Sequence, residues 1–80
     1  MTLENRSPYA AFVKRSLRNL LRVRRVQDLA VNIYCENPND DNWTRLQKAN
    51  KLAEKCRNKH EIETKNHQEW LAIELLKMLP

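Results

Sequence analysis

The segment Pro8–Glu36 constrains the fold most, because it contains no glycine and no proline beyond its first residue. Apolar residues recur in it at steps of three and four, the spacing of one side of an α-helix. The recurring positions are Tyr9, Phe12, Val13, Leu17, Leu20, Val23, Val26, Ala30, Ile33 and Tyr34. Ser7 before Pro8 is a typical helix start, and Asn37 before Pro38 is a typical end, because proline moves the preceding residue out of the α region. We predict one long helix over residues 8–36, preceded by a loose N-terminus at residues 1–6.

A second helix is expected at residues 40–58, after a short polar turn. Asn39 or Asp40 is the expected cap, because either side chain can accept a hydrogen bond from the first N–H groups of that helix. Its apolar side contains Trp43, Leu46, Ala49, Ala53 and Cys56. The short connection predicts that the two helices form an antiparallel hairpin.

The apolar side of this second helix becomes polar toward the C-terminus. At the same spacing the next residues are His60, Glu63 and His67. Either the helix breaks between residues 58 and 66, or this strip of polar residues has a structural or functional role. We favour the break, because Asn66–Glu69 has the spacing of a capping box. A separate helix at residues 66–79, apolar around most of its circumference, is then expected.

Composition supports an all-α fold. The chain has 80 residues, enough for one small domain. Glycine is absent, whereas β-proteins use glycine at their turns. The predicted fold is therefore a small three-helix domain built on a helical hairpin and completed by homo-oligomerisation, since a largely apolar C-terminal helix must be covered on several sides.

The net charge of +5 is unevenly distributed. Residues 1–59 contain 13 Lys and Arg against 6 Asp and Glu, whereas residues 60–80 contain 2 against 4. A basic body indicates an anionic partner. We expect no membrane span, because no apolar run reaches about 18 residues. Two cysteines and no apolar leader segment favour a cytoplasmic, reduced protein.

Basic residues form two rows at helical spacing. We predict that they contact the phosphate backbone of DNA or RNA, because guanidinium groups suit phosphate. The row on the first helix is Lys14, Arg15, Arg18, Arg22 and Arg25, and the row on the second is Arg45, Lys48, Lys55 and Lys59. Arg24 points toward the apolar side of its helix. The alternatives are a merely solvated face, or pairing of the second row with Glu54, Glu61 and Glu63 within its own helix.

The C-terminal segment is the expected oligomer or partner interface. Its residues are Trp70, Leu71, Ile73, Leu75, Leu76, Met78 and Leu79. The apolar sector of the first helix also drifts around the helix toward its C-terminal end, which fits either different neighbours along the helix or a contact with a partner subunit. We expect a homodimer through these two features. The alternative function is an adaptor or inhibitor that docks on an acidic protein surface through the basic helix and this segment.

The remaining motifs do not favour catalysis. No phosphate loop or nucleophile motif is present, so we expect no enzyme activity, no cofactor and no small-molecule substrate. Cys56, His60, Glu63 and His67 are metal-ligand types, but one straight helix cannot wrap four ligands around an ion, and we interpret them as an interfacial strip without metal. The aromatic residues are expected core anchors. Gln27, Asn32, Asn42, Gln47 and Asn50 could contact base edges, although nothing in the sequence places them in a groove.

Overall fold

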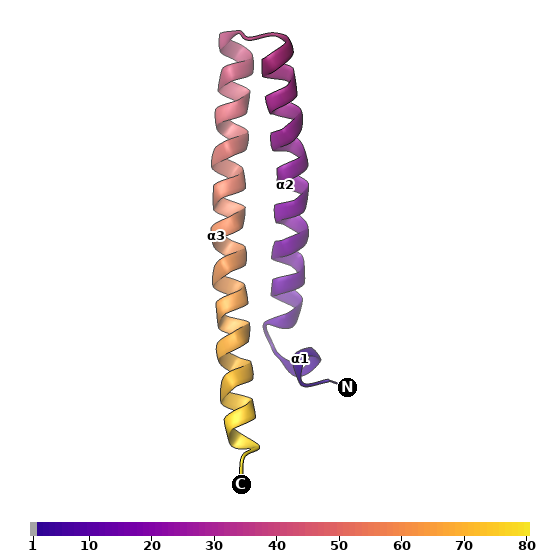
Figure 1. Cartoon of the computed structure of the whole chain (residues 1–80), viewed down its shortest axis with the longest axis vertical. Helices are drawn as coiled ribbons and strands as arrows, with labels where there is room; N and C mark the ends of the chain where they lie inside the picture. The colour runs from indigo at the N-terminus through magenta and orange to yellow at the C-terminus, as the bar shows by residue number, and fades with distance from the viewer. Residues whose placement is uncertain (1) are drawn as a thin grey trace.

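A computed structural model describes residues 2–80, which form a long antiparallel helical hairpin (Figure 1). The three helices are α1 (Leu3–Arg6), α2 (Ala10–Glu36) and α3 (Asp40–Lys77). Residues 2–80 contain no β-strand, which confirms the all-α prediction. The hairpin measures 64 × 19 × 14 Å, and its radius of gyration is 18.0 Å. A compact domain of this length would have a radius of gyration of about 12 Å, so the fold is very extended.

The ends of α2 follow from local hydrogen bonds near the predicted positions. At its start the Ser7 hydroxyl oxygen accepts from the Tyr9 N–H at 3.1 Å, and the Ser7 carbonyl accepts from the Ala10 N–H at 3.2 Å. Ser7 therefore shapes the turn that leads into α2, whose N-cap is Tyr9. The assigned start is two residues later than predicted, which is within the usual variation of helix ends. The other end, Glu36, is as predicted.

The turn between α2 and α3 is fixed by asparagine side chains. Asn39 Oδ1 accepts from the Asn42 N–H at 2.8 Å, so Asn39 rather than Asp40 is the N-cap of α3. The Asn42 side chain then donates to the Asn37 carbonyl at 2.8 Å and closes the turn. The short connection produces the antiparallel hairpin that the sequence predicts.

The predicted break between residues 58 and 66 is wrong, because α3 runs unbroken through this segment. The expected helix at residues 66–79 is the C-terminal part of α3, and Asn66 lies inside the helix rather than at a cap. The helix can continue with this polar strip because serine hydroxyls lie opposite its two histidines. His60 Nδ1 lies 2.8 Å from Ser16 Oγ, and His67 Nδ1 lies 2.8 Å from Ser7 Oγ.

The N-terminus also differs from the expectation of a loose segment. Leu3–Arg6 form a single helical turn, whose N-cap Thr2 accepts from the Asn5 N–H at 3.4 Å. The part of the prediction that concerns Met1 lies outside the described residues. This turn lies beside α3, where Leu3 shares a hollow with Leu71 and Leu75.

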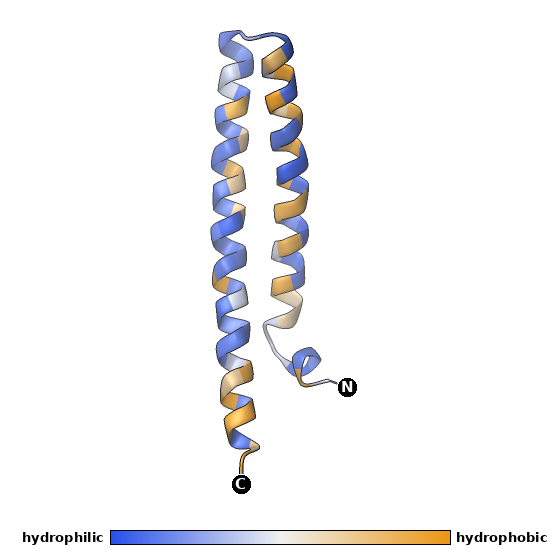
Figure 2. Cartoon of the chain, in the orientation of Figure 1, coloured by the Kyte–Doolittle hydropathy of each residue, from blue (hydrophilic) through white to orange (hydrophobic). Residues whose placement is uncertain are grey.

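The contact between α2 and α3 is narrow. The buried apolar residues are Leu20, Leu46, Ala49 and Ala53. Gln27 donates to Asn50 across the contact at 2.7 Å. Most other large apolar residues are exposed, and Figure 2 shows apolar segments along α2 and at the C-terminal end of α3. A two-helix hairpin has too few layers to cover both sides of its helices.

Beyond the start of α2, α3 continues without α2 beside it, and only the short α1 lies near its side, at Leu71 and Leu75. Ser7 lies opposite His67, whereas α3 reaches Lys77 (Figure 1). We name residues 70–79 the C-terminal overhang. Among its side chains, Leu76 is 67% exposed and Leu79 is 66% exposed.

Candidate anion-binding surface

The five cations of the first row form one exposed surface on the outer side of α2, here named the outer row. Its members are Lys14, Arg15, Arg18, Arg22 and Arg25, and all five are exposed. Leu20 and Gln27 face α3. By the 3.6-residue period, most of the outer row lies roughly opposite to these two residues. From Lys14 to Arg25 the row extends about 16 Å along the helix.

The second row lies on a different side of the hairpin. Leu46 and Ala53 are buried against α2, so Lys48 and Lys55 lie near the opposite side of α3 by the helical period. The two rows therefore point away from each other and do not form one groove. The exception is Lys59, which lines a hollow of about 160 Å³ together with Arg15 of the outer row.

Neither row forms an ion pair with an acid of the chain within residues 2–80. Within residues 2–80 the one salt bridge joins Lys77 Nζ to Glu74 Oε1 at 3.1 Å. Neither row contains Lys77, so the expected alternative, pairing with Glu54, Glu61 or Glu63, is not observed in this part of the chain. The outer row also has no acid between its members; the first acid in α2 is Asp28. Its charges are thus open to an external anion.

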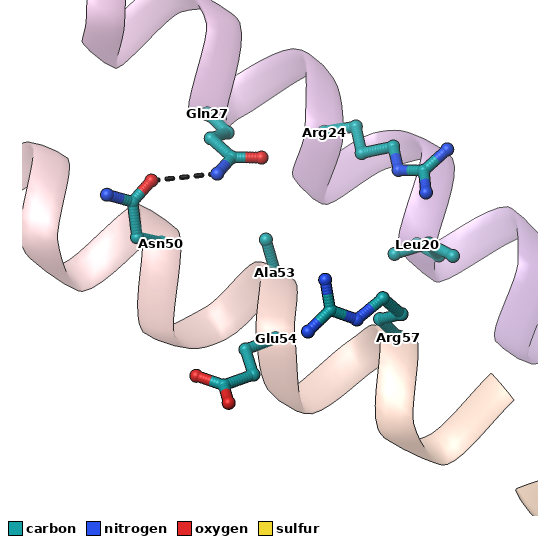
Figure 3. A pocket seen from close by; sticks show the side chains of 7 residues that line it. All are labelled: Leu20, Arg24, Gln27, Asn50, Ala53, Glu54 and Arg57. Atoms are coloured by element: carbon teal, nitrogen blue, oxygen red, sulfur yellow. Dashed lines mark hydrogen bonds between the residues drawn. The ribbon is translucent and has the colours of Figure 1, made fainter. Parts of the chain in front are cut away.

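Arg24 lies apart from the outer row, as the sequence predicts, and lines a pocket between the two helices (Figure 3). The pocket has a volume of about 370 Å³ and lies over Leu20 and Ala53. Arg57 lines the same pocket from α3, and the Gln27–Asn50 hydrogen bond lies at one end. Sequence reasoning missed Arg57. Arg57 follows Asn50 by seven residues, about two helical turns, so both lie on one side of α3. This spacing can be read from the sequence and could have identified Arg57.

Some polar residues considered for base recognition are engaged inside the hairpin. Gln27 and Asn50 bond to each other, and Asn42 closes the turn. The aromatic pair Tyr34–Trp43 packs near the turn with ring centroids 5.3 Å apart. These contacts use the side chains to hold α2, α3 and the turn between them together.

The Ser16–His60 pair joins the two helices. The Ser16 hydroxyl donates to the Val13 carbonyl at 3.0 Å, and Ser16 Oγ lies 2.8 Å from His60 Nδ1. Ser16 is also only 4% exposed.

The predicted polar strip does not gather metal ligands. Across residues 2–80, no three His, Cys, Asp or Glu side chains come close enough together to hold a metal ion. Cys35 and Cys56 are both free thiols. No helix in the same part of the chain has the length and apolar character needed to cross a membrane.

Comparison with known proteins gives no relative from which a function could be transferred. The chain matches no protein-family model, no curated protein and no solved structure.

Proposed function

We propose that the protein is a non-enzymatic accessory or regulatory module that binds the phosphate backbone of DNA or RNA through the outer row of α2. The observation that carries the proposal is the outer row itself: five exposed cations on one side of one helix, without an interspersed acid and without a salt bridge within residues 2–80. Four of the five are arginines, whose planar guanidinium groups can contact phosphate oxygens with two N–H donors.

The second row has a smaller role in this proposal. Its residues, Arg45, Lys48, Lys55 and Lys59, lie on α3, largely on the other side of the hairpin. A straight duplex seated on the outer row does not reach Arg45, Lys48 and Lys55 at the same time, whereas Lys59 lies close to Arg15 of the outer row. The second row therefore adds long-range attraction, or holds a separate segment of nucleic acid, and contributes less to the affinity of the first contact.

A charge-reversal experiment tests the proposal. Arg18→Glu with Arg22→Glu should lower the affinity for labelled duplex DNA, single-stranded DNA or RNA by at least 100-fold in fluorescence-anisotropy titrations, because two phosphate contacts become repulsive. The matched control is Lys51→Glu with Lys65→Glu, two exposed positions of α3 outside both rows. It changes the net charge by the same amount.

The two variants separate a local contact from a general effect of charge. The control should lower the affinity less than tenfold, and circular dichroism should show that both variants keep their helix content. An equal loss of affinity in the two variants would contradict a role for the outer row.

A second candidate function rests on a different observation, the exposure of the C-terminal overhang. Ile73, Leu75 and Met78 are more than half exposed. An adaptor or inhibitor could use such residues as the apolar centre of an interface with an acidic protein, while the basic rows supply complementary charge. For this function Trp70→Ala should weaken partner binding more than reversal of Arg18 and Arg22 does.

A further inference from the structure

The isolated hairpin exposes more surface than a folded monomer of its size. Its accessible surface is 6539 Å². A monomer of 9.6 kDa exposes roughly 5,100 Å², so the excess is about 1,400 Å². Each partner of a standard protein–protein interface buries about 800 Å². The excess is therefore sufficient for a stable interface with another helical surface.

An apolar hollow lies near the turn, on one side of the hairpin. Val26, Leu29, Ala30 and Ile33 of α2 line it with Ala49 of α3. Asn42 and Arg45 complete its lining, and its volume is about 210 Å³. Val26 is 52% exposed. This hollow lies on the drifted apolar sector that the sequence assigns to a partner contact.

The C-terminal overhang lies at the opposite end of the hairpin from this hollow (Figure 1). Because α3 is one continuous helix, the overhang cannot fold back into the hollow of its own chain. Trp70 of the overhang nevertheless lies on the same side of α3 as Arg45 of the hollow, because the two are 25 residues, or about seven helical turns, apart.

We propose that the occupant of the apolar hollow is the C-terminal overhang of a second copy of this chain. The two copies run antiparallel and are related by a two-fold axis, so each overhang lies in the hollow of the other copy and both contacts form together. When Trp70 is placed opposite Leu52 of the second copy, Ile73 falls opposite its Ala49. A large apolar side chain then meets a small one.

Complementary charges at positions 59 and 63 favour an antiparallel over a parallel pairing. In this antiparallel register Lys59 falls opposite Glu63 of the second copy, and Glu63 falls opposite its Lys59. Both residues line one hollow, on the same side of α3 as Arg45, and neither is in a salt bridge within residues 2–80. A parallel pairing in register would instead place Lys59 against Lys59 and Glu63 against Glu63, which is repulsive.

The overhang also differs in charge from the rest of the chain. Residues 70–79 contain Glu74 and Lys77, which form a salt bridge with each other, so the overhang carries no net charge. The same register places Glu74 opposite Lys48 of the second copy and Lys77 opposite its Arg45. Most of the outer row lies away from this interface. The interface includes Lys48 and Lys59 of the second row, but the outer row makes the proposed first contact with nucleic acid. Reversal of Arg18 and Arg22 therefore tests that contact separately from the dimer.

Complementary charge reversals test the dimer. Sedimentation equilibrium of the native full-length chain should give twice the mass of the chain. Lys59→Glu alone places two acids opposite each other, and Glu63→Lys alone places two bases opposite each other, so each should weaken the dimer at least tenfold. An equimolar mixture of the two variants should restore it, because position 59 of each chain then faces an opposite charge at position 63 of the other. The double variant Lys59→Glu/Glu63→Lys should restore it as well.

The matched controls are Arg57→Glu and Glu61→Lys. These residues have the same spacing and the same order of charge, but Arg57 lines the pocket on the other side of the hairpin. Neither control should change the dimer, and Ile73→Glu should dissociate it in the native background. A native chain that stays monomeric, or single variants that fail to associate on mixing, would overturn the proposal.

Discussion

The two halves of the contact between α2 and α3 are held together by different chemistry. Near the turn, Leu46, Ala49 and Ala53 are buried, and the rings of Tyr34 and Trp43 pack against each other. Farther from the turn, polar Ser–His pairs replace the apolar contacts. The two helices are therefore held together mainly by buried apolar side chains in the half near the turn, and mainly by Ser–His hydrogen bonds in the half farther from it.

The difference matters for stability because the two kinds of contact are not equivalent. Burial of an apolar side chain contributes more than one intramolecular hydrogen bond, whose net value is about 1 kcal/mol. The polar half also contains the Thr64 hydroxyl, which is buried and makes no hydrogen bond within residues 2–80. The half near the turn should therefore contribute most of the free energy of unfolding, and the other half should open more readily.

The largest effect is expected from Leu46→Ala in the apolar half. Removing this buried side chain leaves a cavity, and should lower the free energy of unfolding by about 2–3 kcal/mol. Urea denaturation followed by circular dichroism measures the change. A loss below about 0.5 kcal/mol would mean that Leu46 is not part of the stabilising core.

A smaller effect is expected from Ser16→Ala in the polar half. It leaves His60 Nδ1 without its partner and should cost about 1 kcal/mol. Hydrogen exchange should show faster opening around His60 and little change around Leu46. A uniform increase in exchange along α3 would contradict the division of the contact into two halves.

Much of the fold was predictable from local signals. The end of α2 depends on Asn37 before Pro38, and the cap of α3 on Asn39, both within a few residues of the structure they determine. Apolar periodicity was sufficient to predict the hairpin. The continuity of α3 was not predictable in this way, because the partners of His60 and His67 are 44 and 60 residues away in the sequence.

The candidate site was predictable as a set of residues but not as an arrangement. Helical spacing identifies the outer row within α2, because all of its members are on one element. It cannot show that the second row, on α3, lies on a different side, since that depends on how the two helices face each other. For the same reason the convergence of Arg24 and Arg57 on one pocket was visible only in three dimensions.

Phosphate binding by the outer row is tested by the salt dependence of nucleic-acid affinity. Fluorescence anisotropy of the native chain with duplex DNA should give a slope of log affinity against log salt of about −4.5 if all five cations contact phosphates, and about −3.5 with a single strand. A slope near zero, or no binding to DNA or RNA at physiological salt, would contradict phosphate binding by the outer row.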